Sequence, residues 1–306
     1  TEVSETFVPT ATAPEVVTSR TELAKITKSL KHSLLEKSFA AWPQNPVTLQ
    51  PQRISDSYAE GLVMSVYVYQ SQSAIPLNLY VVHDKKLTQA KICELTVLDQ
   101  DGWNNFLSLY RDAFGDRDAL RGEHFVAQDA ASQDPFENLQ QRLLKNSIIM
   151  AYVAPRGIGP TIWDQTKKKQ VQHQRRFYLL GESLESMQVW DVQRAIQAVT
   201  TVTGFNNETK TTLQATGRMA GVSLYAALFQ SGVAELHLTH LPSSHRDGPY
   251  FFNVSRICDI PEIALVVANQ TPLFLYDVDT VAFKHTIDSA AHMNWKQPQL
   301  MITTNK

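Results

Sequence analysis

The segment TTLQATGRMAGVSLYAALFQ, residues 211–230, decides the fold of this chain. In its first half, apolar and polar residues alternate as they do in a half-buried strand. Its second half is almost entirely apolar and long enough for a buried helix. Gly217 and Gly221 bracket the junction, where small residues permit a sharp turn. The segment therefore predicts a strand, a tight turn and a helix in direct succession.

Short apolar runs alternate with helical stretches on both sides of this segment. Such alternation predicts an α/β fold with a mostly parallel central sheet and helices on both faces. Two runs at 62–70 and 75–83 come first and predict antiparallel leading strands. This order resembles the layout of the α/β-hydrolase fold, which is the fold class we expect. Further strands are expected at 91–99, 147–155, 234–241, 272–279 and 299–305, and helices at 103–114, 189–199, 220–230 and 280–292.

The beginning of the chain has the composition of a linker. Residues 1–20 are rich in Thr, Val, Pro and Glu and have neither helical nor alternating periodicity. We expect them to form a linker or a disordered segment. Residues 21–306 are expected to form a single domain that opens with an amphipathic helix at 22–39. Because the chain starts at Thr1, we expect a processed or excised piece that another domain once preceded.

The turn in the central segment fits the pattern Gly-x-Ser-x-Gly except at its middle position. Gly217 and Gly221 occupy the two glycine positions, and Met219 stands where the pattern has a nucleophilic serine. A thioether has no proton to lose and cannot form an acyl intermediate. We therefore interpret Met219 as a degenerate nucleophile position. Gly217 and Arg218 are expected to border the pocket that remains.

Two stretches upstream of the turn carry a resemblance to a known family. Arg156-Gly157-Ile158-Gly159 follows an apolar strand, and RRFYLLGESLESMQVWDVQRAI (175–196) precedes the central segment. Together they resemble acetyl xylan esterases and cephalosporin C deacetylases. The resemblance implies that this domain lies C-terminal to another esterase-like domain of one polypeptide. It also implies a pocket-shaping role for Arg156 and Gly157, whose loop could offer N–H groups to an anion or a carbonyl, with an ordinary glycine-dependent turn as the alternative.

The remaining triad positions are an acid after one strand and a histidine after the last. Asp277 and Asp279 end the strand PLFLYDVD, so either fits the acid position, or serves as a cap for the next helix. No histidine follows the last expected strand. His285 and His292 precede that strand, and we expect both on a helix surface. Two of the three catalytic positions are therefore interpreted as vacant.

Ser183 is the alternative nucleophile. In Gly181-Glu182-Ser183-Leu184-Glu185 it follows an apolar run and precedes a helix, as a nucleophile would. However, Glu185 replaces the final glycine, and the segment comes one strand too early. An active serine hydrolase would combine Ser183 with Asp277 or Asp279 and with His245 or His285.

The loop LPSSHRDGPYFFN (241–253) follows a strand at the edge where open α/β sheets bind ligands. His245 and Arg246 are its candidate binding residues, and polar groups beside aromatic ones suit a sugar-binding surface. The alternative is a solvated loop whose aromatic side chains pack into the hydrophobic core. His237 and His240, three residues apart on a strand, face opposite ways, which argues against a metal pair.

Composition describes an ordinary globular chain, with 43% hydrophobic and 19% charged residues. The net charge is −2 and basic residues are dispersed, so nucleic acid is not an expected partner. The runs KKK (167–169) and RR (175–176) are expected in a solvated loop. No apolar run reaches the roughly 18 to 20 residues of a membrane span. Cys93 and Cys258 are expected as buried thiols, with a disulfide as the alternative, and neither a metal nor a cofactor is expected.

These observations predict a catalytically degenerate, acetyl xylan esterase-like module of a larger secreted or envelope protein. Its role would be structural support, pairing with a catalytic domain, or saccharide binding. The alternative is an active carbohydrate esterase or serine hydrolase that uses Ser183, or a site that another domain completes.

Overall fold

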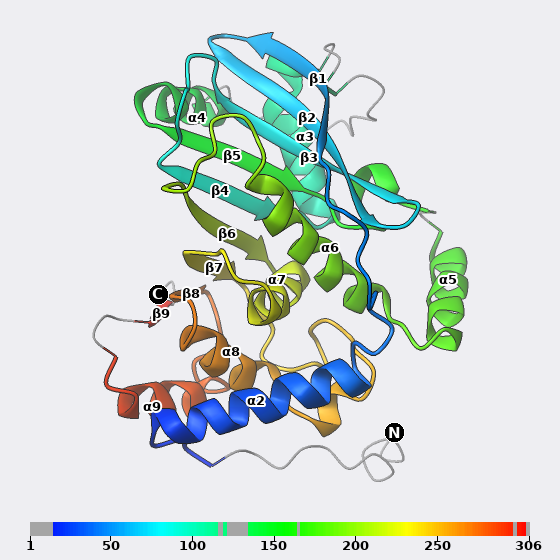
Figure 1. Ribbon diagram of the computed structural model, residues 1–306, viewed down its shortest axis with the longest axis vertical. Coiled ribbons are helices and arrows are strands. Elements are labelled where there is room, and N and C mark those ends of the chain that lie inside the picture. The colour runs from blue at the N-terminus through cyan, green and yellow to red at the C-terminus, as the bar shows by residue number, and fades with distance from the viewer. Residues whose placement is uncertain (1–14, 116–118, 121–133, 164–165, 296–298, 304–306) are drawn as a thin grey trace. The chain divides into compact units, whose positions relative to one another are not determined.

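A computed structural model gives the fold of the chain (Figure 1). The structure describes residues 15–115, 119–120, 134–163, 166–295 and 299–303.

The chain divides into two compact units. We call Pro43–Trp163 together with Asp191–Gln214 the hairpin unit, and the rest, Thr1–Trp42, Asp164–Trp190 and Ala215–Lys306, the elbow unit. Strand β6 (Lys210–Thr216) begins in the first unit and ends in the second. The single domain expected over residues 21–306 stays a prediction.

The strands of the hairpin unit confirm the antiparallel start. Their order is β1-β2-β3-β5-β4-β6, and the amide of Lys210 at the start of β6 donates to the carbonyl of Lys91 beside β4. β1 was not predicted from the sequence, because its exposed residues lack alternation. β1 (Gln52–Ala59), β2 (Leu62–Gln72) and β3 (Ile75–Asp84) are mutually antiparallel, β3 is antiparallel to β5 (Ile148–Val153), and β5 is parallel to β4 (Ile92–Val97).

Helices cover both faces of this sheet. Tyr80 of β3 packs on Trp103 of α3 (Gln100–Phe114), with ring centroids 5.4 Å apart. The hydroxyl of Tyr69 in β2 donates to the carbonyl of Asp191 in α6 (Leu184–Val199). Tyr80 is paired with Val66, three residues from Tyr69, so the two tyrosines lie on opposite faces. α3 and α6 therefore lie on opposite faces of the sheet. α4 (Asp134–Lys145) appears in Figure 1 near the same strands, and Phe136 of α4 contacts Tyr110 of α3 with ring centroids 6.1 Å apart.

In the elbow unit the end of β6 is followed by the parallel strands β7 (Glu235–Thr239), β8 (Leu273–Tyr276) and β9 (Leu300–Thr303). α7 (Arg218–Phe229) follows β6 and is buried over ten successive residues, which explains its uniformly apolar sequence. α2 (Arg20–Lys37) lies alongside α8 (Ile260–Ala268) and α9 (Lys284–His292) in Figure 1.

Three helices were missed from the sequence: α4, α5 (Lys167–Leu179) and α8. α5 replaces the solvated loop expected around KKK and RR, because Lys, Gln and Arg are good helix formers, whatever their charge. α8 begins with a capping box in which Asp259 and Glu262 satisfy the free amides.

The start of the first helix falls inside the expected linker. Ser19 caps α2 by accepting a hydrogen bond from the amide of Glu22 at 3.2 Å. Residues 1–14 of that linker lie outside the described residues. Cys93 and Cys258 are free and buried, as expected. Of the helices that the structure describes, none combines the length and apolarity needed to cross a bilayer.

Candidate functional site

The turn between β6 and α7 is made by Gly217. Its backbone has φ 58° and ψ −127°, a conformation that glycine adopts without steric strain and other residues rarely adopt. Met219, the residue that the sequence placed at the nucleophile position, lies inside α7 with its side chain buried. The helix starts at Arg218, one residue before Met219, so the residue on the sharp turn is Gly217.

The two glycines of this segment meet different surroundings. A Cβ atom on Gly221 would lie 2.5 Å from Cδ of Pro249, so only glycine allows this approach. At Gly217, no atom of the described residues lies within 4 Å of an ideal Cβ position beyond the adjoining chain. The space next to the turn is therefore open, whereas the space next to Gly221 is filled.

Three successive strands end in the same way. Gly217, His240 and Asp277 are the first residues after β6, β7 and β8, and their φ angles are 58°, 51° and 54°. Backbone amides link the strand ends, since Gly217 donates to Thr239 and His240 donates to Tyr276, each at 2.9 Å. The three residues therefore lie together at the carboxyl edge of these strands, where open α/β sheets place their ligands.

His240 and Asp277 form a pair at this edge. Nε2 of His240 lies 3.9 Å from Oδ2 of Asp277, and the histidine side chain is 63% exposed. Asp279, the other candidate acid, accepts a hydrogen bond from the amide of Val281 at 2.9 Å and so stabilises its own turn. Of the two acids, Asp277 is the one that faces a histidine. His240 was expected inside a strand at 234–241, so this pair was not predicted; the strand ends at Thr239.

Ser183 has the contacts of a helix cap. Its hydroxyl donates to the carbonyl of Tyr250 at 2.6 Å and accepts from the amide of Ser186 at 3.1 Å, at the start of α6. The side chain is fully buried. Its proton is directed at a carbonyl oxygen, which cannot act as a general base as histidine does.

His245 is buried and connects two parts of the structure, the 241–253 loop and α7. Nδ1 contacts the carbonyl of Pro249 at 2.7 Å, and Nε2 contacts the hydroxyl of Tyr225 at 2.8 Å. Burial lowers the pKa of His245 and so favours the neutral ring, although the hydrogen bond to the Pro249 carbonyl acts in the opposite direction. Arg246, the other candidate in this loop, is exposed to solvent. His285, from the alternative triad, lies on α9 with Nε2 2.8 Å from the carbonyl of Glu15.

Arg156 is locked into a buried ion pair in the hairpin unit. Nε and Nη2 of Arg156 donate to the two carboxylate oxygens of Asp191 at 2.8 and 2.6 Å, and its backbone amide donates to the same group at 2.9 Å. Ser71 donates to Asp191 at 2.5 Å, and Gln72 accepts from Nη1 of Arg156 at 2.6 Å. Both charged side chains are almost fully buried. The guanidinium therefore fixes the loop after β5.

The amides of that loop are all occupied. Gly157 donates to Oγ1 of Thr161 at 3.0 Å, Ile158 donates to the carbonyl of Pro155 at 3.1 Å, and Gly159 donates to Oε1 of Gln100 at 3.1 Å. An oxyanion hole needs free N–H groups aimed at the substrate. In this conformation the Arg156–Gly157 loop has its amides satisfied by the protein instead.

Beside the turn, Arg218 faces Glu185 of α6. Nη1 of Arg218 lies 3.7 Å from Oε1 of Glu185, with the arginine side chain 59% exposed and the glutamate side chain 10% exposed. Burial raises the pKa of Glu185, and the guanidinium partly offsets this effect. The described residues contain no group of three or more His, Cys, Asp or Glu side chains placed to hold a metal ion.

Solved structures identify the fold. A Bacteroides fragilis protein assigned as an acetyl xylan esterase matches with a TM-score of 0.71 and 14% identity, covering 100% of this chain and 81% of that one. A glucuronoyl esterase from Solibacter usitatus matches with a TM-score of 0.62 and 10% identity, covering 99% of this chain and 95% of that one. A glucuronoyl esterase from Teredinibacter turnerae matches with a TM-score of 0.54 and 11% identity, covering 96% of this chain and 84% of that one. No family model and no curated protein matches the sequence.

The chain therefore has the α/β-hydrolase fold, and carbohydrate esterases are among the solved structures that share it. This confirms the fold class and the resemblance to acetyl xylan esterases that the sequence indicated. His240 was missed as a candidate site residue. A signal was present for His240, because Pro242 two residues later limits how far the strand can extend.

Proposed function

We propose that this chain is a catalytically inactive member of the carbohydrate esterase type of α/β-hydrolase fold. The observation that carries the proposal is Gly217 on the sharp turn between β6 and α7. The turn between strand and helix is where such enzymes expose their nucleophile. Gly217 has no side chain there, and Met219 is buried in the helix behind it. On this proposal, the nucleophile position corresponds to Gly217, and Met219 packs α7.

The loop after β5 gives independent support. With the amides of Arg156, Gly157 and Gly159 bonded within the chain, a developing oxyanion would find no free donor in that loop. The turn therefore offers no nucleophilic side chain at Gly217, and the loop after β5 offers no unoccupied amide among Arg156, Gly157 and Gly159. Loss of two functionally coupled elements favours a retired site over a single chance substitution.

For such a domain we propose an accessory role in a larger secreted or envelope protein that acts on carbohydrates. It would support or pair with an esterase-like catalytic domain of the same polypeptide, or bind the saccharide on which that domain acts. The carbohydrate class is taken from the acetyl xylan and glucuronoyl esterases of the same fold.

A second candidate function is an active hydrolase whose nucleophile comes from another domain. The His240–Asp277 pair favours this alternative, because a histidine beside a carboxylate is what a general base requires. Ser183 is a weaker nucleophile candidate, since its hydroxyl is bonded to the Tyr250 carbonyl.

The test is activity-based labelling of the purified chain with a fluorophosphonate, together with turnover of 4-nitrophenyl acetate. We expect no adduct and no turnover above that of unfolded protein. An adduct on Ser183, or turnover that Ser183→Ala abolishes, would contradict the proposal and establish a serine hydrolase.

A further inference from the structure

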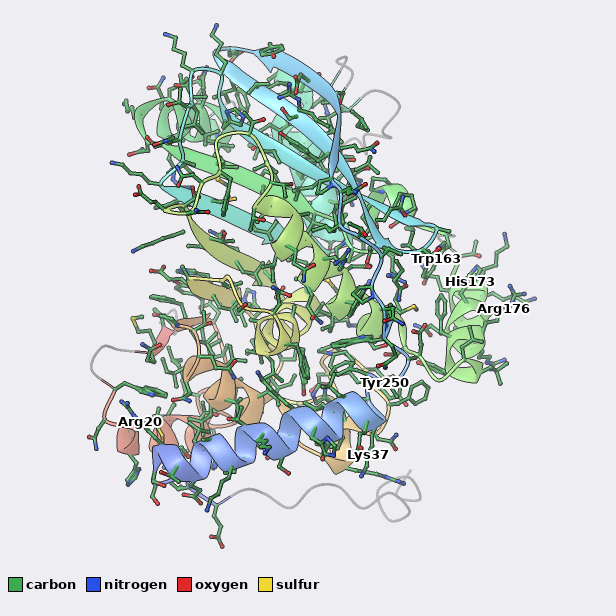
Figure 2. All side chains as sticks on the ribbon, viewed as in Figure 1. Arg20, Lys37, Trp163, His173, Arg176 and Tyr250 are labelled. Carbon is green, nitrogen blue, oxygen red and sulfur yellow. The ribbon has the colours of Figure 1, made fainter. Side chains whose placement is uncertain are left out.

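Three aromatic rings gather on the surface of the elbow unit. Tyr178 at the end of α5, and Tyr250 and Phe252 of the 241–253 loop, have ring centroids 5.4 to 5.8 Å apart, and we call them the tyrosine platform. Tyr178 is 40% exposed and Tyr250 is 44% exposed. Figure 2 shows Tyr250 at the surface near Lys37, the last residue of α2. Aromatic side chains in this arrangement offer ring faces to a ligand as well as to one another.

The loop that carries two of these rings is held rigidly. Pro249 packs against Gly221, and its carbonyl contacts Nδ1 of His245 at 2.7 Å. The carbonyl of the next residue, Tyr250, accepts a hydrogen bond from the buried hydroxyl of Ser183. The side-chain amide of Asn253 donates to the carbonyl of Lys37 at 3.3 Å. The platform is therefore preorganised, which reduces the entropy lost on binding.

A polar pair adjoins the rings. The charge of Glu185 acts on the hydroxyl of Tyr178, and burial followed by this charge raises the pKa of that phenol. Glu185 is in turn paired with Arg218, which directly follows Gly217. A carboxylate and a guanidinium can accept and donate hydrogen bonds to neighbouring hydroxyl groups of one ligand. Because their charges are opposite, the pair favours a neutral ligand over an anionic one.

We propose that the tyrosine platform, with Glu185 and Arg218, binds a neutral oligosaccharide made of pyranose rings. The C–H face of a pyranose lies flat on a tyrosine ring, whose face carries the negative part of the quadrupole. The hydroxyl groups at the rim of the sugar reach the charged pair. The proposal rests on the carbohydrate-related role inferred above and locates its ligand outside the nucleophile position.

The sugar class is favoured over a protein partner by the local chemistry. Protein-binding hot spots are desolvated centres ringed by apolar contacts. Here, Tyr178 and Tyr250 are 40% and 44% exposed, and a carboxylate and a guanidinium adjoin them, so apolar and hydrogen-bonding groups are combined on one surface.

The test is isothermal titration calorimetry of the whole chain with xylohexaose, cellohexaose and tri-galacturonate. We expect saturable binding of a neutral oligosaccharide, weakened about tenfold or more by Tyr178→Ala or Tyr250→Ala. Tyr178→Phe and Tyr250→Phe keep the ring and should stay within about threefold of the parent. Tyr58→Ala is the matched control, because Tyr58 is 56% exposed on β1 of the other unit.

Arg218→Ala provides a variant outside the aromatic cluster, and circular dichroism checks that each variant is folded. The proposal is overturned by absence of binding to both neutral oligosaccharides at up to about 5 mM. Binding of the acidic trisaccharide alone, or equal weakening in Tyr58→Ala, would also overturn it. Sugar binding together with esterase turnover would keep this inference and contradict the inactive assignment. If the chain shows no binding and no turnover, this inference is contradicted and the inactive assignment is not.

Discussion

Nε2 of His240 lies 3.9 Å from Oδ2 of Asp277, and each of the two residues immediately follows one of two neighbouring parallel strands. Both have positive φ angles, which His and Asp tolerate better than most residues do. Gly217 occupies the equivalent place after the next strand, and its amide donates to the carbonyl of Thr239. A histidine and an acid therefore lie together at two strand ends, next to the strand that Gly217 follows.

The first prediction concerns the turn. Gly217→Ser should make the chain reactive toward a fluorophosphonate, because the space beside Gly217 is open and a hydroxyl there would lie near His240. The positive φ should also lower the free energy of unfolding by about 1 to 3 kcal/mol. Mass spectrometry of the labelled peptide locates the adduct.

Two matched variants control this experiment. Gly217→Ala imposes the same backbone strain without a hydroxyl and should stay unlabelled. Met219→Ser places a hydroxyl inside α7, where the side chain is buried, and should also stay unlabelled. Labelling of Met219→Ser in place of Gly217→Ser would return the nucleophile position to residue 219. Adding His240→Ala to Gly217→Ser should reduce the labelling rate.

The second prediction concerns the buried pair of Arg156 and Asp191. Asp191→Asn leaves a buried guanidinium without its counter-charge, so the free energy of unfolding should fall by about 3 to 5 kcal/mol. Urea unfolding followed by circular dichroism measures this loss. Asp288→Asn removes an exposed partner of Lys284 and should change stability by no more than about 0.5 kcal/mol. Equal effects of the two substitutions would refute a clamp role for Arg156.

The third prediction separates a cap from a nucleophile at Ser183. Ser183→Ala removes the oxygen that accepts a hydrogen bond from the Ser186 amide. The free energy of unfolding should fall by about 1 kcal/mol. Labelling and ester turnover should not change. Ser183→Thr keeps an acceptor oxygen and should lose less stability than Ser183→Ala, as thermal unfolding would detect.

The fourth prediction concerns Glu262 at the start of α8. Burial, and then the charge of Asp259, raise the pKa of Glu262 to about 7, although its hydrogen bond from the Asp259 amide acts in the opposite direction. A folded-state pKa above the unfolded value of 4.5 means that Glu262 favours folding at low pH. This contribution is complete below pH 4.5 and is lost as the pH rises through 7.

Glu262→Gln should therefore remove this pH dependence while keeping an oxygen for the Asp259 amide. At pH 5 the variant and the parent should be similarly stable, and at pH 8 the variant should be more stable by roughly 1 to 3 kcal/mol. Denaturant titrations at both values measure the difference. A stability difference that is the same at pH 5 and pH 8 would be inconsistent with the raised pKa.

Much of the fold could be predicted from local patterns. The antiparallel leading strands and the strand–turn–helix around Gly217 follow from periodicity and glycine placement, which act within a few residues. β1 could not be found this way, because an exposed edge strand needs no apolar alternation. α5 was missed because its charge was weighed above its helix propensity.

The candidate site was predicted less well than the fold. Met219 was assigned by counting from two glycines, whereas the residue on the strained turn depends on where the helix starts. His245 and Ser183 carry chemically suitable groups, yet both are bound to backbone carbonyls of the 249–250 segment. The Ser183 contact joins residues 67 positions apart in the chain, so no local pattern encodes it.

The sequence alone determined the antiparallel leading strands, the strand–turn–helix of residues 211–230 and the lack of a serine at that turn, because these depend on residue type and short-range spacing. Only the tertiary structure decided that Gly217 occupies the turn, that His240 faces Asp277, and that the amides after β5 are occupied. Such facts depend on distances between groups that the folded backbone brings together. Chemistry at a site requires those distances, whereas the fold requires only the pattern.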